Sequence, residues 1–258
     1  MLGAIIGDIT GSVYEFKNVK TKDFPLLTDE SFFTDDTVMT IAVAEALMNG
    51  GQPDDFIDSL KKYGRLYPRV GYGRGFYLWL VSDDRAPYGS WGNGAAMRVS
   101  PCGWFGGRGG SAEELAERSA AVTHDHTEGL KGARATAAAI DMARAGRSKA
   151  EIRGHIEKKY GYDLSRKLDD IRPGYKFDES CQGTVPEAII AFLESDGFED
   201  ALRNAVSLGG DSDTLAAITG GIAEAAYGIP QALADKGLSY LDRPLRAVYD
   251  RWRDFIRL

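Results

Sequence analysis

The sequence predicts an all-α fold, and two observations support this class. Apolar residues recur at helical spacing in several long segments, most of which end at a glycine. Alternation of apolar and polar residues, the pattern of a half-buried strand, allows at most a short hairpin between Ile171 and Phe177. The chain has 258 residues, 43% of them apolar, so we expect one domain covering residues 1–258 with a substantial core.

Helix starts and stops can be followed along the first two thirds of the chain. The apolar run 37–48 is followed by Asn49, Gly50 and Gly51, which is typical of a helix stop. Three later positions have the spacing of a capping box, in which a Ser or Thr precedes a Glu by three residues: Ser111 with Glu114, Ser148 with Glu151 and Thr184 with Glu187. Pro186 fits the first turn of the last of these helices, where a missing N–H group costs little.

Further helices are predicted at 127–145, 198–208, 215–227 and 244–256. The small residues of segment 215–227 indicate close packing at the centre of a bundle, and segment 244–256 carries one apolar stripe. Three glycine-rich segments lack helical periodicity and are expected to form loops, which often carry function: 64–75, 89–94 and 103–110.

Composition argues against several classes of function. The net charge is -7 and no basic stretch stands out, which disfavours binding to nucleic acid. No run of about 18 apolar residues is present, and the N-terminus lacks the basic region of a signal peptide. Cys102 and Cys181 lie far apart without metal-type spacing, which fits a reducing compartment. We therefore expect a cytoplasmic protein without a membrane partner.

Two short acidic motifs stand directly before predicted helices, at 33–37 (FTDDT) and 209–214 (GGDSDT). Either motif alone is well explained as a helix cap, because Asp and Thr accept hydrogen bonds from the first N–H groups. Two such motifs, each before a strongly apolar helix, suggest a cation-binding site, since buried carboxylates repel each other unless a cation compensates them. Their all-oxygen donors suit Mg²⁺, Mn²⁺ or Ca²⁺, and pairs of such ions about 3.5–4 Å apart are common.

A third candidate feature is the pair His124 and His126. A transition-metal site is disfavoured, because His155 is the only other histidine in the chain. Ordinary structural roles for the pair, or a polar contact from it to a ligand, remain open.

Taken in order, the motifs resemble those of the ADP-ribosylglycohydrolase family. The resemblance is carried by six segments that run through most of the chain: 3–15 (GAIIGDITGSVYE), 33–37, 71–75 (GYGRG), 89–99 (GSWGNGAAMRV), Thr123-His124 and 207–214 (SLGGDSDT). The resemblance implies an orthogonal helical bundle around a binuclear site holding two Mg²⁺ or Mn²⁺ ions. It also implies the metal ligands Thr34, Asp35, Asp36, Asp211, Asp213 and Thr214.

The same resemblance implies a reaction and its other residues. The expected substrate is an ADP-ribosylated protein or a small ADP-ribose conjugate, and the bond that is hydrolysed is the glycosidic bond to the acceptor. Glu15 matches a catalytic glutamate near the metals, and we expect a monomer. The residues expected to bind the ADP-ribose part are Gly71, Tyr72, Gly73, Ser90, Trp91, Gly92, Asn93 and His124.

Two departures from the family pattern and two alternatives complete the prediction. Ser212 replaces a common threonine, and the loop 69–73 lacks the aspartate of the arginine-specific branch, which favours O-linked ADP-ribose. One alternative is a relative that binds ADP-ribose or has a structural role without catalysis. The other is a Mg²⁺-dependent enzyme acting on isoprenoid diphosphates, which Met39 and Thr40 disfavour because a further acid is normal one turn after the first pair.

Overall fold

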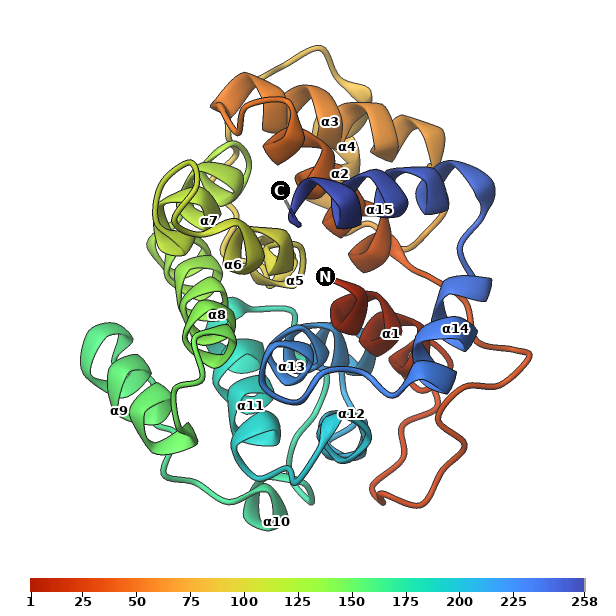
Figure 1. Ribbon diagram of the computed structural model, residues 1–258, viewed down its shortest axis with the longest axis vertical. Coiled ribbons are helices and arrows are strands. Elements are labelled where there is room, and N and C mark those ends of the chain that lie inside the picture. Colours follow the sequence, from red (N-terminus) through yellow and green to blue (C-terminus); the bar gives the residue numbers. More distant parts are fainter. Residues whose placement is uncertain (258) are drawn as a thin grey trace.

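The computed structural model describes residues 1–257, which form fifteen α-helices and no β-strand within that range (Figure 1). The prediction of an all-α fold is confirmed. The helices are α1 (Leu2–Gly11), α2 (Asp35–Met48), α3 (Pro53–Leu66), α4 (Arg74–Val81), α5 (Gly94–Met97), α6 (Ser100–Phe105), α7 (Ala112–Ala121), α8 (Thr127–Arg144), α9 (Lys149–Tyr160), α10 (Leu168–Ile171), α11 (Cys181–Leu193), α12 (Phe198–Ser207), α13 (Ser212–Tyr227), α14 (Gln231–Ser239) and α15 (Arg243–Phe255).

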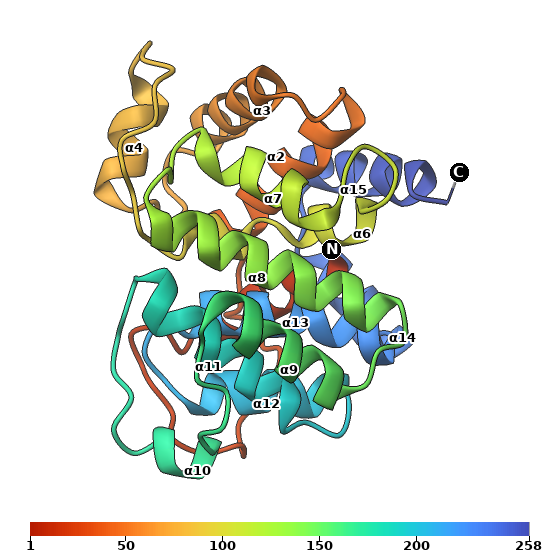
Figure 2. The ribbon, with the colours of Figure 1, turned by 90° about the vertical axis from the view of Figure 1, so that its left-hand side faces the viewer.

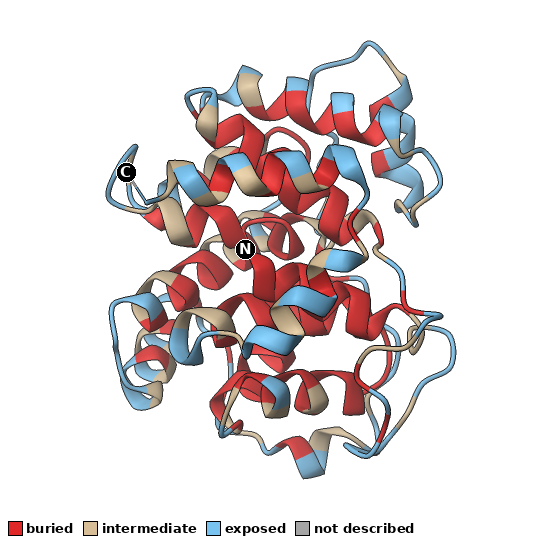
Figure 3. Cartoon of the chain, turned by 45° about the vertical axis from the view of Figure 1, so that its right-hand side comes forward, coloured by how far each residue is buried: buried red, intermediate tan, exposed pale blue. Residues whose placement is uncertain are grey.

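The helices pack in two groups. Helices α2, α3 and α15 lie at one end, and α11 and α12 lie at the other (Figures 1 and 2). Several helices are almost wholly covered: every residue of α1 is buried, α2 is buried from Asp36 to Leu47, and α13 is buried from Ser212 to Ala223. Figure 3 shows this buried centre, with exposed residues confined to the outer helix faces and loops. Both acidic motifs therefore begin helices that run into the core.

Glycines allow α1 to lie directly against α13. Gly3, Gly7 and Gly11 recur every four residues on one face of α1, and each faces the backbone of α13. A Cβ atom on Gly7 would overlap the carbonyl group of Ala216, and one on Gly11 would overlap Asp213. The predicted close packing of the small residues of α13 is confirmed, and its partner is α1, which the sequence analysis did not identify as a helix.

Two of the three predicted capping boxes are confirmed. Ser111 and Ser148 each accept a hydrogen bond from the backbone N–H of the glutamate three residues later, and each glutamate reciprocates. The box at Thr184 is wrong, because α11 begins three residues earlier and Ser180 caps it by accepting from the N–H of Gly183 at 3.0 Å. Pro186 consequently lies inside α11 rather than in its first turn.

The remaining sequence expectations differ from the structure at a few boundaries. The hairpin at 171–177 is wrong: α10 ends at Ile171, whose carbonyl group accepts from the N–H groups of Gly174 and Tyr175 in a turn. The glycine-rich segments are partly helical, because α3 extends to Leu66 and α6 reaches Phe105. Among residues 1–257, no helix has the length and apolar character needed to cross a membrane.

Candidate active site

A cavity of about 560 Å³ brings the two acidic motifs together. Its lining comes from the starts of α2 and α13, the segment after α1, and the loops before α4 and α5. Every site residue predicted from the sequence except Tyr72 lines it: Glu15, Thr34, Asp35, Asp36, Gly71, Gly73, Ser90, Trp91, Gly92, Asn93, His124, Asp211, Asp213 and Thr214.

At the start of α2, the backbone is held by an aspartate from α1. Thr34 is the N-cap, and its Oγ1 accepts from the N–H of Asp36 at 3.2 Å. The carboxylate of Asp8, which is fully buried, accepts from the N–H of Thr34 (2.9 Å), from its hydroxyl (2.7 Å) and from the N–H of Thr37 (3.0 Å). Asp8 thus fixes the helix start that presents Asp35 and Asp36 to the cavity.

The role of Asp8 was not predicted, although the sequence carries a signal for it. Asp8 is the single acid within the apolar run 1–9, so its burial against a polar partner could have been expected. Which donors it would meet depends on how α1 and α2 pack, and local sequence does not specify that packing.

The start of α13 is shaped by two glycines and an asparagine. Gly209 and Gly210 have φ angles of 68° and 71°, in the left-handed region that glycine tolerates. The side chain of Asn18 accepts from the N–H of Gly210 at 2.8 Å and donates to the carbonyl group of Glu15 at 2.7 Å. This bridge ties the segment that carries Glu15 to the second acidic motif.

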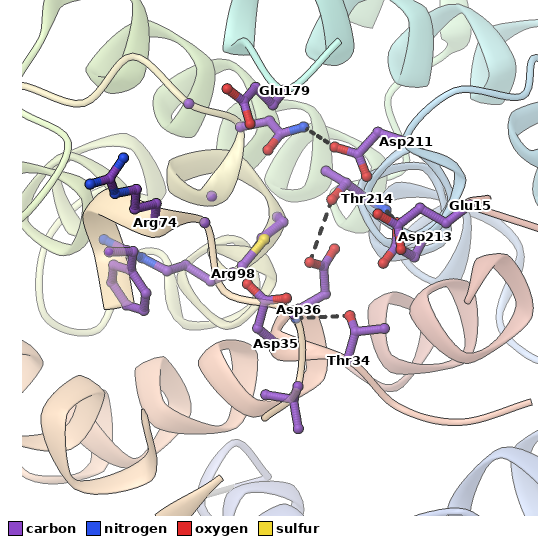
Figure 4. A pocket seen from close by; sticks show the side chains of 18 of the residues that line it. Glu15, Thr34, Asp35, Asp36, Arg74, Arg98, Glu179, Asp211, Asp213 and Thr214 are labelled. Atoms are coloured by element: carbon purple, nitrogen blue, oxygen red, sulfur yellow. Dashed lines mark hydrogen bonds between the residues drawn. The ribbon is translucent and has the colours of Figure 1, made fainter. Parts of the chain in front are cut away.

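The two motifs contact each other across the cavity (Figure 4). The hydroxyl of Thr214 lies 3.4 Å from Asp36 Oδ1. Carboxylate oxygens of Glu15, Asp211 and Asp213 all lie within 4.8 Å of one another, a spacing at which three acids could share one cation. Segments that are about 175 residues apart in the chain therefore form one anionic cluster.

Electrostatics show that the cluster lacks compensation by the protein. Burial, followed by repulsion from neighbouring carboxylates, raises the pKa of Asp35 and Asp36 well above the usual aspartate range. Burial likewise raises the pKa of Asp213 and of Glu15 to about 7. Among the described residues, no Lys, Arg or His forms an ion pair with any carboxylate of the cluster.

One atom marks the missing partner most clearly. Asp36 Oδ2 is buried and has no hydrogen-bond partner in the described chain. A buried carboxylate oxygen without a donor is costly, and a divalent cation would satisfy it. The donor set around it consists of carboxylate and threonine oxygens, which is the chemistry that a hard cation requires.

The opposite side of the cavity is formed by the loop 88–94 and by His124. The N–H of Asn93 donates to the carbonyl group of Glu179 at 2.7 Å, and its side chain donates to Asp211 Oδ2 at 2.7 Å. Trp91 has 44% of its surface exposed, so it does not pack in the core and is free to contact a ligand. Further exposed aromatic residues surround the opening: Phe16, Phe32 and Phe177.

At two places the structure separates the roles of neighbouring residues that the sequence had grouped together. His124 lines the cavity, whereas Nδ1 of His126 caps α8 by accepting from the N–H of Glu128 at 3.2 Å. Gly71 and Gly73 line the cavity, whereas Tyr72 between them does not. The ring of Tyr72 packs on Phe76 with centroids 5.6 Å apart.

Comparison with known proteins identifies similar chains over almost the whole length. The profile of the ADP-ribosylglycohydrolase family matches residues 1–253. The mouse ADP-ribosylhydrolase ARH3 is 28% identical, covering 90% of this chain and 83% of its own. The ADP-ribosylarginine hydrolase Tri1 of Pseudomonas putida is 27% identical, covering 89% of this chain and 70% of its own. A solved structure described as an ADP-ribosylglycohydrolase-related protein complex has a TM-score of 0.69 and 28% identity, covering 96% of this chain and 94% of that one.

Proposed function

The chain belongs to the ADP-ribosylglycohydrolase family, and from this premise we propose that it hydrolyses the glycosidic bond between ADP-ribose and an acceptor. The observation that carries the proposal is the uncompensated cluster of buried carboxylates at the floor of a cavity. Repulsion between these acids destabilises the folded state unless a cation joins them, and a divalent cation beside a glycosidic bond is suited to its hydrolysis.

The proposed cofactors are two Mg²⁺ or Mn²⁺ ions. The residues that would hold them are Thr34, Asp35, Asp36, Asp211, Asp213 and Thr214, and Asp36 Oδ2 is the oxygen that most needs such a partner. Divalent cations in such a site polarise oxygen atoms and lower the pKa of water. Asp8 has a different role: it holds the N-terminus of α2, so that the ligand side chains are oriented before any ion binds.

We assign Glu15 to proton handling or substrate orientation during bond cleavage. Its side chain lines the cavity beside Asp211 and Asp213, and Asn18 fixes the backbone that carries it. A positioned carboxyl group can remove a proton from an attacking water or donate one to the leaving group. The loop 89–94 and Trp91 would bind the ADP-ribose part, with the tryptophan ring available to stack on adenine.

For the acceptor, we propose an O-linked group rather than a guanidinium. The loop 69–73 borders the cavity and contains no carboxylate that could pair with an arginine side chain. The charged side chains that this loop and the start of α4 add to the cavity are Arg69 and Arg74, which would repel a cationic acceptor.

The decisive experiment is a panel of ADP-ribosylated acceptors, linked through serine, arginine or an acyl group, incubated with Mg²⁺, Mn²⁺ or a chelator. We expect release of ADP-ribose that needs a divalent cation and is fastest with an O-linked acceptor. Asp36→Ala and Asp213→Ala should abolish turnover, while Asp170→Asn, at an exposed position away from the cavity, should leave it unchanged. Unchanged turnover in both alanine variants would rule out the proposed site.

A further inference from the structure

Arg98 is a fully buried arginine without an acidic partner. It lines the cavity on the side away from Asp211 and Asp213, as Figure 4 shows, and only 1% of its surface is exposed. No carboxylate forms an ion pair with it in the described chain, and burial lowers its pKa to about 10. Burying an unpaired guanidinium is expensive. Its carbon lies 5.8 Å from the centroid of the Phe76 ring and its Nε has no hydrogen-bond partner in the described residues, so the hydrogen bonds of Nη2 are its main polar compensation.

Those hydrogen bonds form a chain that leads to His124. The Nη2 group of Arg98 donates to the carbonyl group of Ser119 at 2.6 Å and to Oγ1 of Thr123 at 2.9 Å. Oγ1 of Thr123 in turn lies 2.7 Å from Nδ1 of His124. Thr123 has no exposed surface, so water does not compete for its hydroxyl group.

This chain determines which nitrogen of His124 carries the proton. A hydroxyl group has one hydrogen to donate, and Thr123 already accepts from a guanidinium that can only donate. The remaining acceptor within its reach is Nδ1 of His124, since no other acceptor contacts Oγ1 in the described residues. A protonated Nδ1 could donate to the second lone pair of Oγ1, but the hydroxyl hydrogen would then have no acceptor in the described residues. The arrangement therefore favours an unprotonated Nδ1, with the hydrogen of the neutral imidazole on Nε2.

We propose that Arg98 and Thr123 are positioning residues that fix His124 as a neutral Nε2–H donor facing the cavity. Nε2 makes no hydrogen bond within the described chain and lies beside the loop 92–94, where a Cβ atom on Gly94 would come within 3.2 Å of it. Burial and the nearby Arg98 both lower the pKa of His124, which supports the neutral form.

The proposal defines the ligand atom that this donor selects. A fixed N–H group accepts no hydrogen bond, so it favours an oxygen that can only accept, such as a diphosphate oxygen, over a hydroxyl or amine that must donate. On the proposed function, the diphosphate of ADP-ribose offers such oxygens, and the new inference is confined to Arg98 and Thr123 as the residues that set the tautomer. Arg98 contributes indirectly, through the tautomer, and is not assigned a contact with the ligand.

The test is long-range ¹H–¹⁵N NMR of the histidine rings in the full chain, with His126 and His155 as internal references and His124→Gln for assignment. Wild-type protein without ligand should show His124 as the Nε2–H tautomer at neutral pH. Thr123→Val removes the hydroxyl while keeping the shape and should mix the tautomers, and Arg98→Met should do the same. Thr123→Ser should restore the wild-type signal.

ADP-ribose affinity, measured by calorimetry, provides the second readout. Loss of a fixed donor to a charged group should raise the Kd of Thr123→Val by about tenfold, whereas Thr123→Ser should stay within about twofold. Thr219→Val is the matched control, because it removes a buried hydroxyl that bonds to the carbonyl group of Ala188 outside the cavity. It should change neither readout.

Three results would overturn the inference: an Nδ1–H or charged His124 in the wild type, an unchanged tautomer in Thr123→Val, or an unchanged Kd in that variant. Failure of the proposed function would look different. If the wild type released no ADP-ribose from any acceptor, the reaction assignment would fall, while the NMR signal of the ligand-free protein would still decide the roles of Arg98 and Thr123.

Discussion

On one side of the cavity, five carboxylates, three of them buried and two partly buried, lie together without a cationic partner in the described chain, and on the other side Arg98 is buried without an acidic one. We call the first side the acidic wall (Glu15, Asp35, Asp36, Asp211, Asp213) and the second the loop wall (residues 89–94, Arg98, His124). In the loop wall, Nη2 of Arg98 donates to the neutral acceptors Ser119 and Thr123, while Nε of Arg98 has no hydrogen-bond partner in the described chain. The acidic wall leaves Asp36 Oδ2 without any partner.

The difference indicates a division of labour between the two walls. The loop wall holds a buried cation and the exposed ring of Trp91, which suits it to binding the anionic and aromatic parts of a substrate. The acidic wall would gain its missing partners from the divalent cations proposed above, which would suit it to chemistry on the bond that changes. Variants of the acidic wall should accordingly alter kcat, and variants of the loop wall should alter Kd.

The largest effect is expected on the acidic wall. Glu15→Gln keeps the size and polarity of the side chain but removes its ability to accept a proton, so kcat should fall by about 10² to 10³. Glu30→Gln, at an exposed position outside the cavity, should retain full activity and serves as the control. A Glu15→Gln enzyme with kcat within threefold of the wild type would remove Glu15 from the reaction.

On the loop wall, Trp91→Ala should weaken ADP-ribose binding by about tenfold, because stacking of a base on an aromatic ring contributes about 1–3 kcal/mol. Trp91→Phe should retain most of the affinity, and kcat at saturation should change little in either variant. Calorimetry and saturation kinetics measure the two quantities separately. A loss confined to kcat would contradict the division between the walls.

The free energy of unfolding of the metal-free protein should fall as the pH rises from about 4 to 7. In a protein whose acids are paired with cations it rises instead. The folded-state pKa values of Asp8 (about 6) and Asp213 (about 7) lie above their unfolded values, so the folded state binds more protons. Its advantage is complete below about pH 4 and is lost as the pH rises through 6 and 7.

This prediction can be checked by thermal unfolding in a chelator between pH 5 and pH 8. We expect Tm to fall by roughly 5 °C as the pH rises. Added Mn²⁺ should remove most of the fall, and Asp36→Asn, which deletes one repelling charge, should reduce it without metal. A Tm in chelator that rises steadily across this interval would show that the acids are compensated from within the chain.

The smallest effect is expected from Tyr72→Phe. The hydroxyl of Tyr72 is buried without a hydrogen-bond partner, and the side chain does not line the cavity. Removing a group that makes no hydrogen bond should leave kcat and Kd within about twofold of the wild type. A tenfold fall in kcat or rise in Kd would show that Tyr72 does act in the substrate site, as the sequence motif suggested.

The sequence was informative where the chemistry is local. The starts of α2 and α13 could be predicted because each combines Asp and Thr with an apolar run, and all but one of the predicted site residues line the cavity. Tyr72 was wrongly expected to line the cavity because neighbouring residues in a loop point in different directions, which a motif match does not reveal. The helix cap was wrongly predicted at Thr184 because Ser180, an equally good cap, stands four residues earlier, and spacing alone does not choose between them.

Other features depend on tertiary structure and could not be read from spacing. Asp8 acquires its role only because α1 packs beside α2. The link from Arg98 to His124 joins the residue that ends α5 to the segment between α7 and α8, through the side chain of Thr123. No sequence pattern within either segment specifies such a meeting. Roles of this kind are determined by packing and were therefore invisible before the structure.

The glycine face of α1 imposes a final constraint on how this protein can evolve. Gly7 and Gly11 admit no side chain against α13, and Asp8 and Glu15 are carried by α1 and the segment that follows it. A methyl group added at either glycine would push α1 away from α13. Asp8 and Glu15 would then both move relative to Asp213. Substitutions that change the acceptor preference are therefore easier to accommodate at the aromatic opening of the cavity, where Phe16 and Phe177 are exposed, than at the contact between α1 and α13.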